Sequence, residues 1–244
     1  MTKEEIMEMV KRAQESGISN TPTETLKDYG LDGFNCEKCG NTGTITRQEN
    51  GMLYSSECDC MKIRRSMRRI RNSGMTDMLV RYTFDNFEET NGIKERAKQF
   101  VDDDGWLYIA GRSGSGKTHI CTAICSEIIK KGIEVYYMSW RDESVNLKAS
   151  VNDADYYDKR MRKLKTVSVL YIDDFLKAGD SDADIRLAFE ILNARYNDRK
   201  LRTIISSERE LESLFDRDEA LAGRIYERAK KYNLRSPQRN RRMS

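Results

Sequence analysis

The sequence of 244 residues contains no long apolar run, no strong excess of either charge and no internal repeat. No stretch approaches the roughly 18 consecutive apolar residues that suggest a membrane-spanning helix, so we expect no membrane partner. The opening stretch, MTKEEIMEMVKRAQESG, is charged and lacks the apolar centre of a secretory signal, so the cytoplasm is the expected location. The net charge of +3 is too small to indicate nucleic-acid binding by itself. These absences leave a soluble chain, long enough for one sizeable domain and a small second one.

Histidine occurs once and cysteine six times, and four of the cysteines fall in one short segment. In a reducing cytoplasm these cysteines are expected to be metal ligands rather than disulfides. They form a Cys-x-x-Cys pair and a Cys-x-Cys pair among glycines, and thiolates on such tight turns suit a tetrahedral Zn²⁺. We therefore predict a structural zinc site, with free thiols or an iron–sulfur cluster as alternatives. Its ligands are Cys36, Cys39, Cys58 and Cys60.

Short apolar runs alternate with helical patterns from residue 105 onward. The runs are predicted to be buried strands at Trp106–Ala110, Val135–Trp140, Val167–Ile172 and Thr203–Ser206. Helices are predicted at 117–131, about 154–164, 184–199 and 218–231. This alternation predicts an α/β fold with a parallel central sheet flanked by helices.

The composition changes near residue 75, where we place a boundary between two domains, 1–75 and 76–244. Helical spacing predicts helices within residues 1–30, and a basic helix is predicted at Lys62–Asn72. The basic residues of that helix spread around it, so contact with nucleic-acid phosphates and a solvated surface are both open. Cys121 and Cys125, four residues apart in a helical pattern, are predicted to be small core residues.

The segment Gly111-Arg112-Ser113-Gly114-Ser115-Gly116-Lys117-Thr118 fits the phosphate-binding pattern G-x-x-x-x-G-K-[ST] between a strand and a helix. Its glycines let backbone N–H groups surround phosphates, and the helix N-terminus favours anions. We predict that it binds ATP, with Lys117 at the β- and γ-phosphates and Thr118 on Mg²⁺. His119 is included among the nucleotide-binding candidates, although a packed helix position is the favoured interpretation.

Two carboxylates, Asp173 and Asp174, end the apolar run that precedes them. In a parallel sheet that end lies at the same edge as the phosphate loop. We predict that Asp173 holds Mg²⁺ and that Asp174 orients or deprotonates the attacking water.

Two further positions have both a functional and a structural interpretation. Ser207 lies in Ser206-Ser207-Glu208 after the fourth predicted strand, where polar groups would face a γ-phosphate or cap the next helix. Arg224 lies in a helical pattern, where it would be solvated, salt-bridged or extended to a neighbouring subunit's γ-phosphate.

The order of these motifs resembles that of DnaC-type helicase loaders, including phage versions, and of their IstB-like relatives among the AAA+ ATPases. The resemblance covers most of the chain. It rests on Phe84-Asp85-Asn86-Phe87, GRSGSGKTH at 111–119, LYIDDF at 170–175, IISSE at 204–208 and EALAGRIYER at 219–228.

The resemblance implies an AAA+ P-loop NTPase domain preceded by a small zinc-binding domain that contacts a helicase. It implies ATP-dependent delivery of a replicative hexameric helicase of the DnaB type onto single-stranded DNA, with ATP-dependent self-association. By this analogy Lys117, Thr118 and Asp173 bind ATP and Mg²⁺, and Asp174 is the catalytic carboxylate. Ser207 would lie near the sensor after the fourth strand, and Arg224 would be the finger supplied to a neighbour.

The chain departs from the family pattern at three places. Asp174 stands where many AAA+ proteins have Glu, and its side chain is one methylene shorter, which predicts slow hydrolysis. Ser207 stands where relatives often have Asn, and the C-terminal sensor arginine is not assigned among Arg235, Arg239 and Arg241. Two alternatives are an IstB-like transposition helper ATPase, acting with a transposase on double-stranded DNA, and a zinc-dependent nucleic-acid-binding module with a regulatory nucleotide site.

Overall fold

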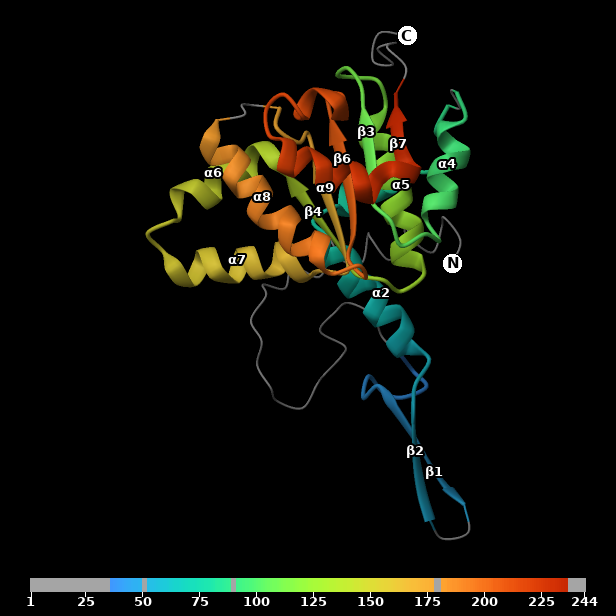
Figure 1. Cartoon of the computed structure of the whole chain (residues 1–244). Helices are drawn as coiled ribbons and strands as arrows, with labels where there is room; N and C mark the ends of the chain where they lie inside the picture. The colour runs from blue at the N-terminus through green and yellow to red at the C-terminus, as the bar shows by residue number, and fades with distance from the viewer. Residues whose placement is uncertain (1–35, 50–51, 89–90, 178–180, 237–244) are drawn as a thin grey trace. The chain divides into compact units, whose positions relative to one another are not determined.

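The computed structural model describes residues 36–49, 52–88, 91–177 and 181–236 (Figure 1). Backbone contacts divide the chain into two compact units, Met1–Asn72 and Ser73–Ser244, and each is described by itself. The helices predicted within residues 1–30 and the tail arginines Arg239 and Arg241 lie outside the described residues. Among the helices of the described part, none is long and apolar enough to cross a membrane.

The first unit contains a two-stranded antiparallel sheet and one helix. Strand β1 (Thr44–Glu49) pairs with β2 (Met52–Glu57), and α2 (Cys60–Asn72) follows. The basic helix predicted at this position is therefore confirmed, whereas the hairpin replaces a segment whose composition is typical of a loop. The whole of β2 is exposed, so the hairpin has almost no apolar core of its own. A two-stranded hairpin is marginally stable alone.

The second unit is built on a five-stranded sheet in the order β4-β5-β6-β3-β7, with every neighbouring pair parallel. Its strands are β3 (Leu107–Ala110), β4 (Val135–Ser139), β5 (Val169–Asp173), β6 (Arg202–Ser207) and β7 (Asn233–Arg235). The first four agree in position with the predicted runs, which are apolar because both faces of the sheet are covered. The fifth strand was missed, because three residues carry too little pattern to identify a strand.

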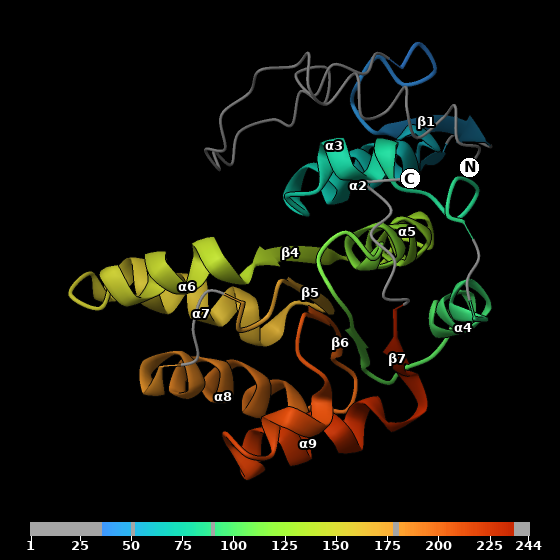
Figure 2. The same cartoon turned by 90° about the horizontal axis from the view of Figure 1, so that it is seen from above.

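Helices cover both faces of this sheet (Figure 2). They are α3 (Thr76–Arg81), α4 (Ile93–Phe100), α5 (Lys117–Lys130), α6 (Trp140–Ala149), α7 (Ala154–Thr166), α8 (Asp182–Asn197) and α9 (Glu219–Ala229), with the short 3₁₀ helices η2 (Leu211–Leu214) and η3 (Lys230–Tyr232). Helix α5 packs on β4, β5 and β6 from one face, and α3 and α4 pack against α5. The other face carries α7, α8 and α9. Because all strands run the same way, their carboxyl ends meet at one edge, where ligands bind in open α/β sheets.

Candidate functional site

The phosphate loop connects β3 to α5 at the carboxyl edge of the sheet. Gly116, the residue before α5, has φ 95°, a left-handed conformation that glycine adopts without strain. Gly111 is required for a different reason, since a Cβ there would lie 2.8 Å from Cβ of Ser236 and 3.0 Å from Oγ of Ser115. The first turn of α5 has no acidic residue and Gly116 makes no side-chain capping hydrogen bond, so the helix N-terminus favours an anion.

Lys117 is the cation inside this loop. Its side chain is buried, and Nζ donates to the carbonyl oxygens of Gly111 at 2.6 Å and Arg112 at 3.0 Å. Burial lowers the pKa of Lys117, partly opposed by the nearby carboxylates of Glu208 and Asp174. The sequence therefore forms a loop that holds its lysine at the cavity where phosphates would bind.

One cavity collects most of the predicted nucleotide-binding residues. It is lined by Tyr82, Ser113, Gly114, Gly116, Lys117, Thr118, His119, Asp174 and Lys177. Ser115 points elsewhere, with a buried hydroxyl that has no hydrogen-bond partner among the described residues. The glycine cradle and the lysine at a helix N-terminus fit a polyphosphate, which is the ligand that this motif selects.

Thr118 and Asp173 meet below the loop. They are 55 positions apart in sequence, yet Thr118 Oγ1 lies 3.3 Å from each carboxylate oxygen of Asp173. The hydroxyl of Tyr137 donates to the same carboxylate at 3.3 Å, and Ser206 Oγ donates to its other oxygen. Asp173 is the last residue of β5 and is buried, so these partners fix its orientation. Hydroxyl and carboxylate oxygens are the ligands that Mg²⁺ takes beside substrate phosphates.

Asp174 occupies an unusual backbone position. Its φ is 54°, and its N–H donates to Ser206 Oγ at 3.2 Å. The carboxylate lies 3.0 Å from Nζ of Lys177, which also lies 3.1 Å from Glu208. The predicted catalytic carboxylate therefore lines the cavity and is held in an ion pair.

The two serines at the end of β6 face opposite ways, as alternate strand residues do. Ser206 contacts Asp173 and Asp174, whereas Ser207 Oγ donates to the carbonyl of Phe175 at 3.0 Å and accepts from N–H of Arg209. A sensor role for Ser207 stays a prediction. Ser206 was missed as a contact of the candidate Mg²⁺ ligand, although strand alternation would have separated the two serines had the register with β5 been known.

His119 joins the cavity wall to the segment before α4. Its Nε2 lies 3.0 Å from the carbonyl of Thr83 and 2.9 Å from Oδ1 of Asn86. Its ring also stacks near Tyr82 and meets Phe87 edge-on. These contacts have the character of packing, and nucleotide binding by His119 stays a prediction.

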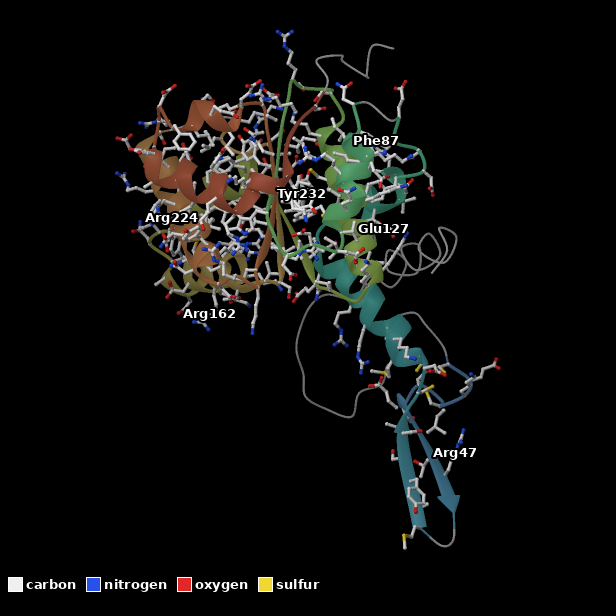
Figure 3. The ribbon with its side chains drawn as sticks, turned by 45° about the vertical axis from the view of Figure 1, so that its right-hand side comes forward. Arg47, Phe87, Glu127, Arg162, Arg224 and Tyr232 are labelled. Carbon is white, nitrogen blue, oxygen red and sulfur yellow. The ribbon has the colours of Figure 1, made fainter. Side chains whose placement is uncertain are left out.

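Arg224 lies on α9, on the face of the sheet opposite α5 (Figure 3). Its guanidinium donates to Oδ1 of Asn193 and to the carbonyl of Ala220, both at 2.8 Å, and lies over the ring of Phe189. The side chain is part-buried and does not reach the cavity of its own chain. That position is compatible with a finger for a neighbouring copy, and this role stays a prediction.

The four cysteines of the first unit converge. Their sulfur atoms all lie within 4.8 Å of one another, with Sγ of Cys36 3.7 Å from that of Cys58 and Sγ of Cys39 3.6 Å from that of Cys60. Desolvation raises the pKa of Cys39, but hydrogen bonds from the Gly43 backbone and the other cysteines outweigh it and bring the pKa to about 6. Four convergent thiols fit a tetrahedral metal with sulfur ligands. Cys121 and Cys125, in contrast, are buried in α5, which confirms them as core residues.

A glycine-rich loop between a strand and a helix, a buried lysine and an aspartate ending a nearby strand define a P-loop nucleotide-binding protein. Residues 47–232 match a family model described as IstB-like ATP binding protein. The chain belongs to this family of ATP-binding proteins, which confirms the predicted resemblance and the AAA+ fold class with its parallel sheet.

Known relatives agree with this assignment. The chain is similar to the phage-like element PBSX protein XkdC of Bacillus subtilis (strain 168), with 28% identity over 95% of this chain and 91% of that protein. It is 23% identical to the replicative helicase loader DnaC of Escherichia coli (strain K12), over 67% of this chain and 71% of that protein. Among solved structures, DnaI shares the fold, with a TM-score of 0.56, 20% identity and coverage of 68% of this chain and 92% of that chain.

Proposed function

We propose that this chain is an ATP-dependent helicase loader in DNA replication, acting in the cytoplasm. It binds a replicative hexameric helicase of the DnaB type and single-stranded DNA, and ATP binding with slow hydrolysis is the switch. The observation that supports the ATP-dependent part of the proposal is the meeting of Thr118 with Asp173 beside Lys117 in a chain of this family. The similarity to a protein described as a replicative helicase loader supports a helicase as the partner.

The nucleotide is bound by the loop and by two residues below it. The N–H groups of Ser113, Gly114 and Gly116 and the ammonium of Lys117 bind the phosphates, while His119 closes the side of the cavity. The N–H groups of Gly111 and Ser115 donate instead to the carbonyls of Ser207 at 3.1 Å and Arg112 at 3.2 Å, so these two residues shape the loop. Thr118 and Asp173 would hold Mg²⁺, which would supply positive charge to offset that of the phosphates. Tyr137 and Ser206 keep the Asp173 carboxylate oriented for this task.

Hydrolysis uses Asp174 to orient and deprotonate water, with Ser207 near the terminal phosphate. The Asp174 side chain is one methylene shorter than the Glu of many AAA+ proteins, so its carboxylate lies farther from the attacking water and turnover is slow. Arg224 supplies a positive charge to the γ-phosphate of a neighbouring copy, which makes ATP the ligand that favours self-association.

Residues 1–75 form the helicase-interaction domain and 76–244 the ATPase domain. In the first, Cys36, Cys39, Cys58 and Cys60 hold a structural zinc ion, which would link the base of the hairpin to α2. Four thiolates close the coordination shell, so this metal has no catalytic position.

The decisive experiment is a pull-down with purified full-length protein, ATP and either a replicative helicase or a transposase. We expect ATP-dependent retention of the helicase, and ATPase activity that changes when single-stranded DNA is added. Retention of the transposase alone would overturn the loader proposal, and absence of hydrolysis with both DNA and helicase would remove the enzyme assignment.

A second candidate is a transposition helper ATPase, favoured by the IstB-like description of the family. It has the same nucleotide site, and it predicts binding of a transposase and of double-stranded DNA instead. The same pull-down separates the two candidates.

A further inference from the structure

Lys177 lines the nucleotide cavity, and neither the phosphate motif nor the carboxylate pair includes it. It shares this cavity with Ser113, Gly114, Gly116, Lys117 and Thr118 of the phosphate loop. Two lysines therefore face one small space, and each lowers the cost of placing a polyanion there.

A tight turn after β5 puts Lys177 beside Asp174. The N–H of Lys177 donates to the carbonyl of Asp174 at 3.1 Å, and the two residues between them, Phe175 and Leu176, are buried anchors. The N–H of Phe175 also donates to the carbonyl of Ser206 at 2.8 Å. These contacts fix the turn, and the turn holds the side chains of Asp174 and Lys177 close together.

The two lysines of the cavity are held differently. Lys117 is 5% exposed and donates to two backbone carbonyls, so its position is fixed by the loop. Lys177 has a side chain 34% exposed, and its partners Asp174 and Glu208 are each 36% exposed. Ion pairs with this much exposure are weak and give way to a better anion. Lys177 is thus the cation in the cavity that can change partner.

We propose that Lys177 is a phosphate-recognising residue of the nucleotide site that exchanges Asp174 for the terminal phosphate of ATP. While its ammonium binds Asp174, that carboxylate is occupied. The terminal phosphate of a triphosphate carries more negative charge than the Asp174 carboxylate. It therefore binds the Lys177 ammonium and leaves Asp174 facing water. A nucleoside diphosphate has no third phosphate at this position and leaves the ion pair intact. Lys177 therefore makes the site select ATP over ADP, an inference that rests on the proposed ATP-binding function.

The test compares the binding of a non-hydrolysable ATP analogue and of ADP, measured by calorimetry or fluorescence on the full chain. We expect Lys177→Met to weaken analogue binding about tenfold while ADP binding changes less than about threefold, because only the terminal phosphate loses a charge-assisted bond. Lys177→Arg should restore part of the preference for the analogue. Equal losses for the two nucleotides, or no loss at all, would overturn the proposal.

A double-mutant cycle tests the exchange itself. Asp174→Asn removes the competing carboxylate and should tighten analogue binding more in the wild-type background than in the Lys177→Met background, because only the lysine can be released. Equal tightening in both backgrounds would show that Asp174 acts by direct repulsion and would contradict the exchange.

The control is Lys148→Met. The Lys148 side chain is 38% exposed, pairs with Asp184 at 2.6 Å and does not line the cavity. It should leave the preference for the analogue over ADP unchanged. Thermal unfolding checks each variant, and Lys177→Gln serves as a second removal with the same expected selectivity. A wild-type chain that binds neither nucleotide overturns the proposed function, whereas tight binding without an effect at Lys177 overturns only this inference.

Discussion

The cysteine cluster and the Thr118–Asp173 pair are both candidate metal sites, but the chain assembles them differently. The cysteines belong to one short segment, and their four sulfur atoms lie within 4.8 Å of one another. Thr118 and Asp173 stand 55 positions apart and meet only because β5 and the start of α5 share an edge of the sheet. Sulfur ligands close a zinc shell completely, whereas two oxygens leave positions for phosphate and water.

This difference indicates which of the two units depends on a bound ion for its fold. The hairpin β1–β2 has exposed side chains along β2 and little apolar core, so the fold of the first unit should require metal. The sheet of the second unit has a core of its own, including Trp106, Trp140 and Phe175, so its fold should be independent of nucleotide.

The largest effect is expected when one cysteine of the cluster is removed. Cys58→Ser should abolish stoichiometric zinc binding and unfold the hairpin, because structural zinc supplies about 10 kcal/mol or more to such small units. Metal analysis and circular dichroism measure the two losses. The Cys58→Ser variant should still bind nucleotide. The control variant Cys121→Ala, which changes a core residue of α5, should bind as much zinc as the unchanged chain. Full zinc retention by Cys58→Ser would contradict the cluster.

A smaller effect is expected at the phosphate loop. Lys117→Ala should weaken ATP binding about 100-fold, since a buried charge-assisted contact to phosphate is lost, while the zinc content stays unchanged. Titration with a fluorescent ATP analogue measures the change. Lys131→Ala, which removes a lysine paired with Asp102 on the surface, is the matched control. Comparable losses in the two variants would mean that Lys117 has no special contact with phosphate.

The smallest effect is expected from lengthening Asp174, the proposed catalytic carboxylate. Asp174→Glu should raise kcat for ATP by about tenfold, because the added methylene brings the carboxylate closer to the attacking water. The affinity for ATP should change less than about threefold, which steady-state kinetics and direct binding distinguish. A lower kcat in this variant would indicate that the turn from Asp174 to Lys177 is fitted to Asp.

Much of the site could be predicted because its signals are local. The phosphate motif, the apolar strand before it and the two carboxylates at the end of β5 can each be recognised within fewer than a dozen neighbouring residues. The grouping of Cys36, Cys39, Cys58 and Cys60 as candidate metal ligands follows from their spacing. The match to the IstB-like family confirms the fold class that these motifs predict.

The remaining features depend on packing between segments that are distant in the sequence. The three-residue strand β7 forms because β3 offers it an edge, and α6 follows β4 without a strong helical pattern of its own. Whether Ser206 or Ser207 faces Asp173 depends on the register between β5 and β6, which the sequence of one strand alone does not specify.

Short stretches of sequence were enough to predict a phosphate loop that binds a nucleotide and a group of four cysteines, because glycine conformations and ligand spacing act within a few residues. Folding was needed to bring Thr118 to Asp173, Ser206 to the Asp173 carboxylate and Lys177 between Asp174 and Glu208. These contacts join β5, β6 and α5, and sheet order and the direction of each side chain are settled only when the strands pair and the core packs.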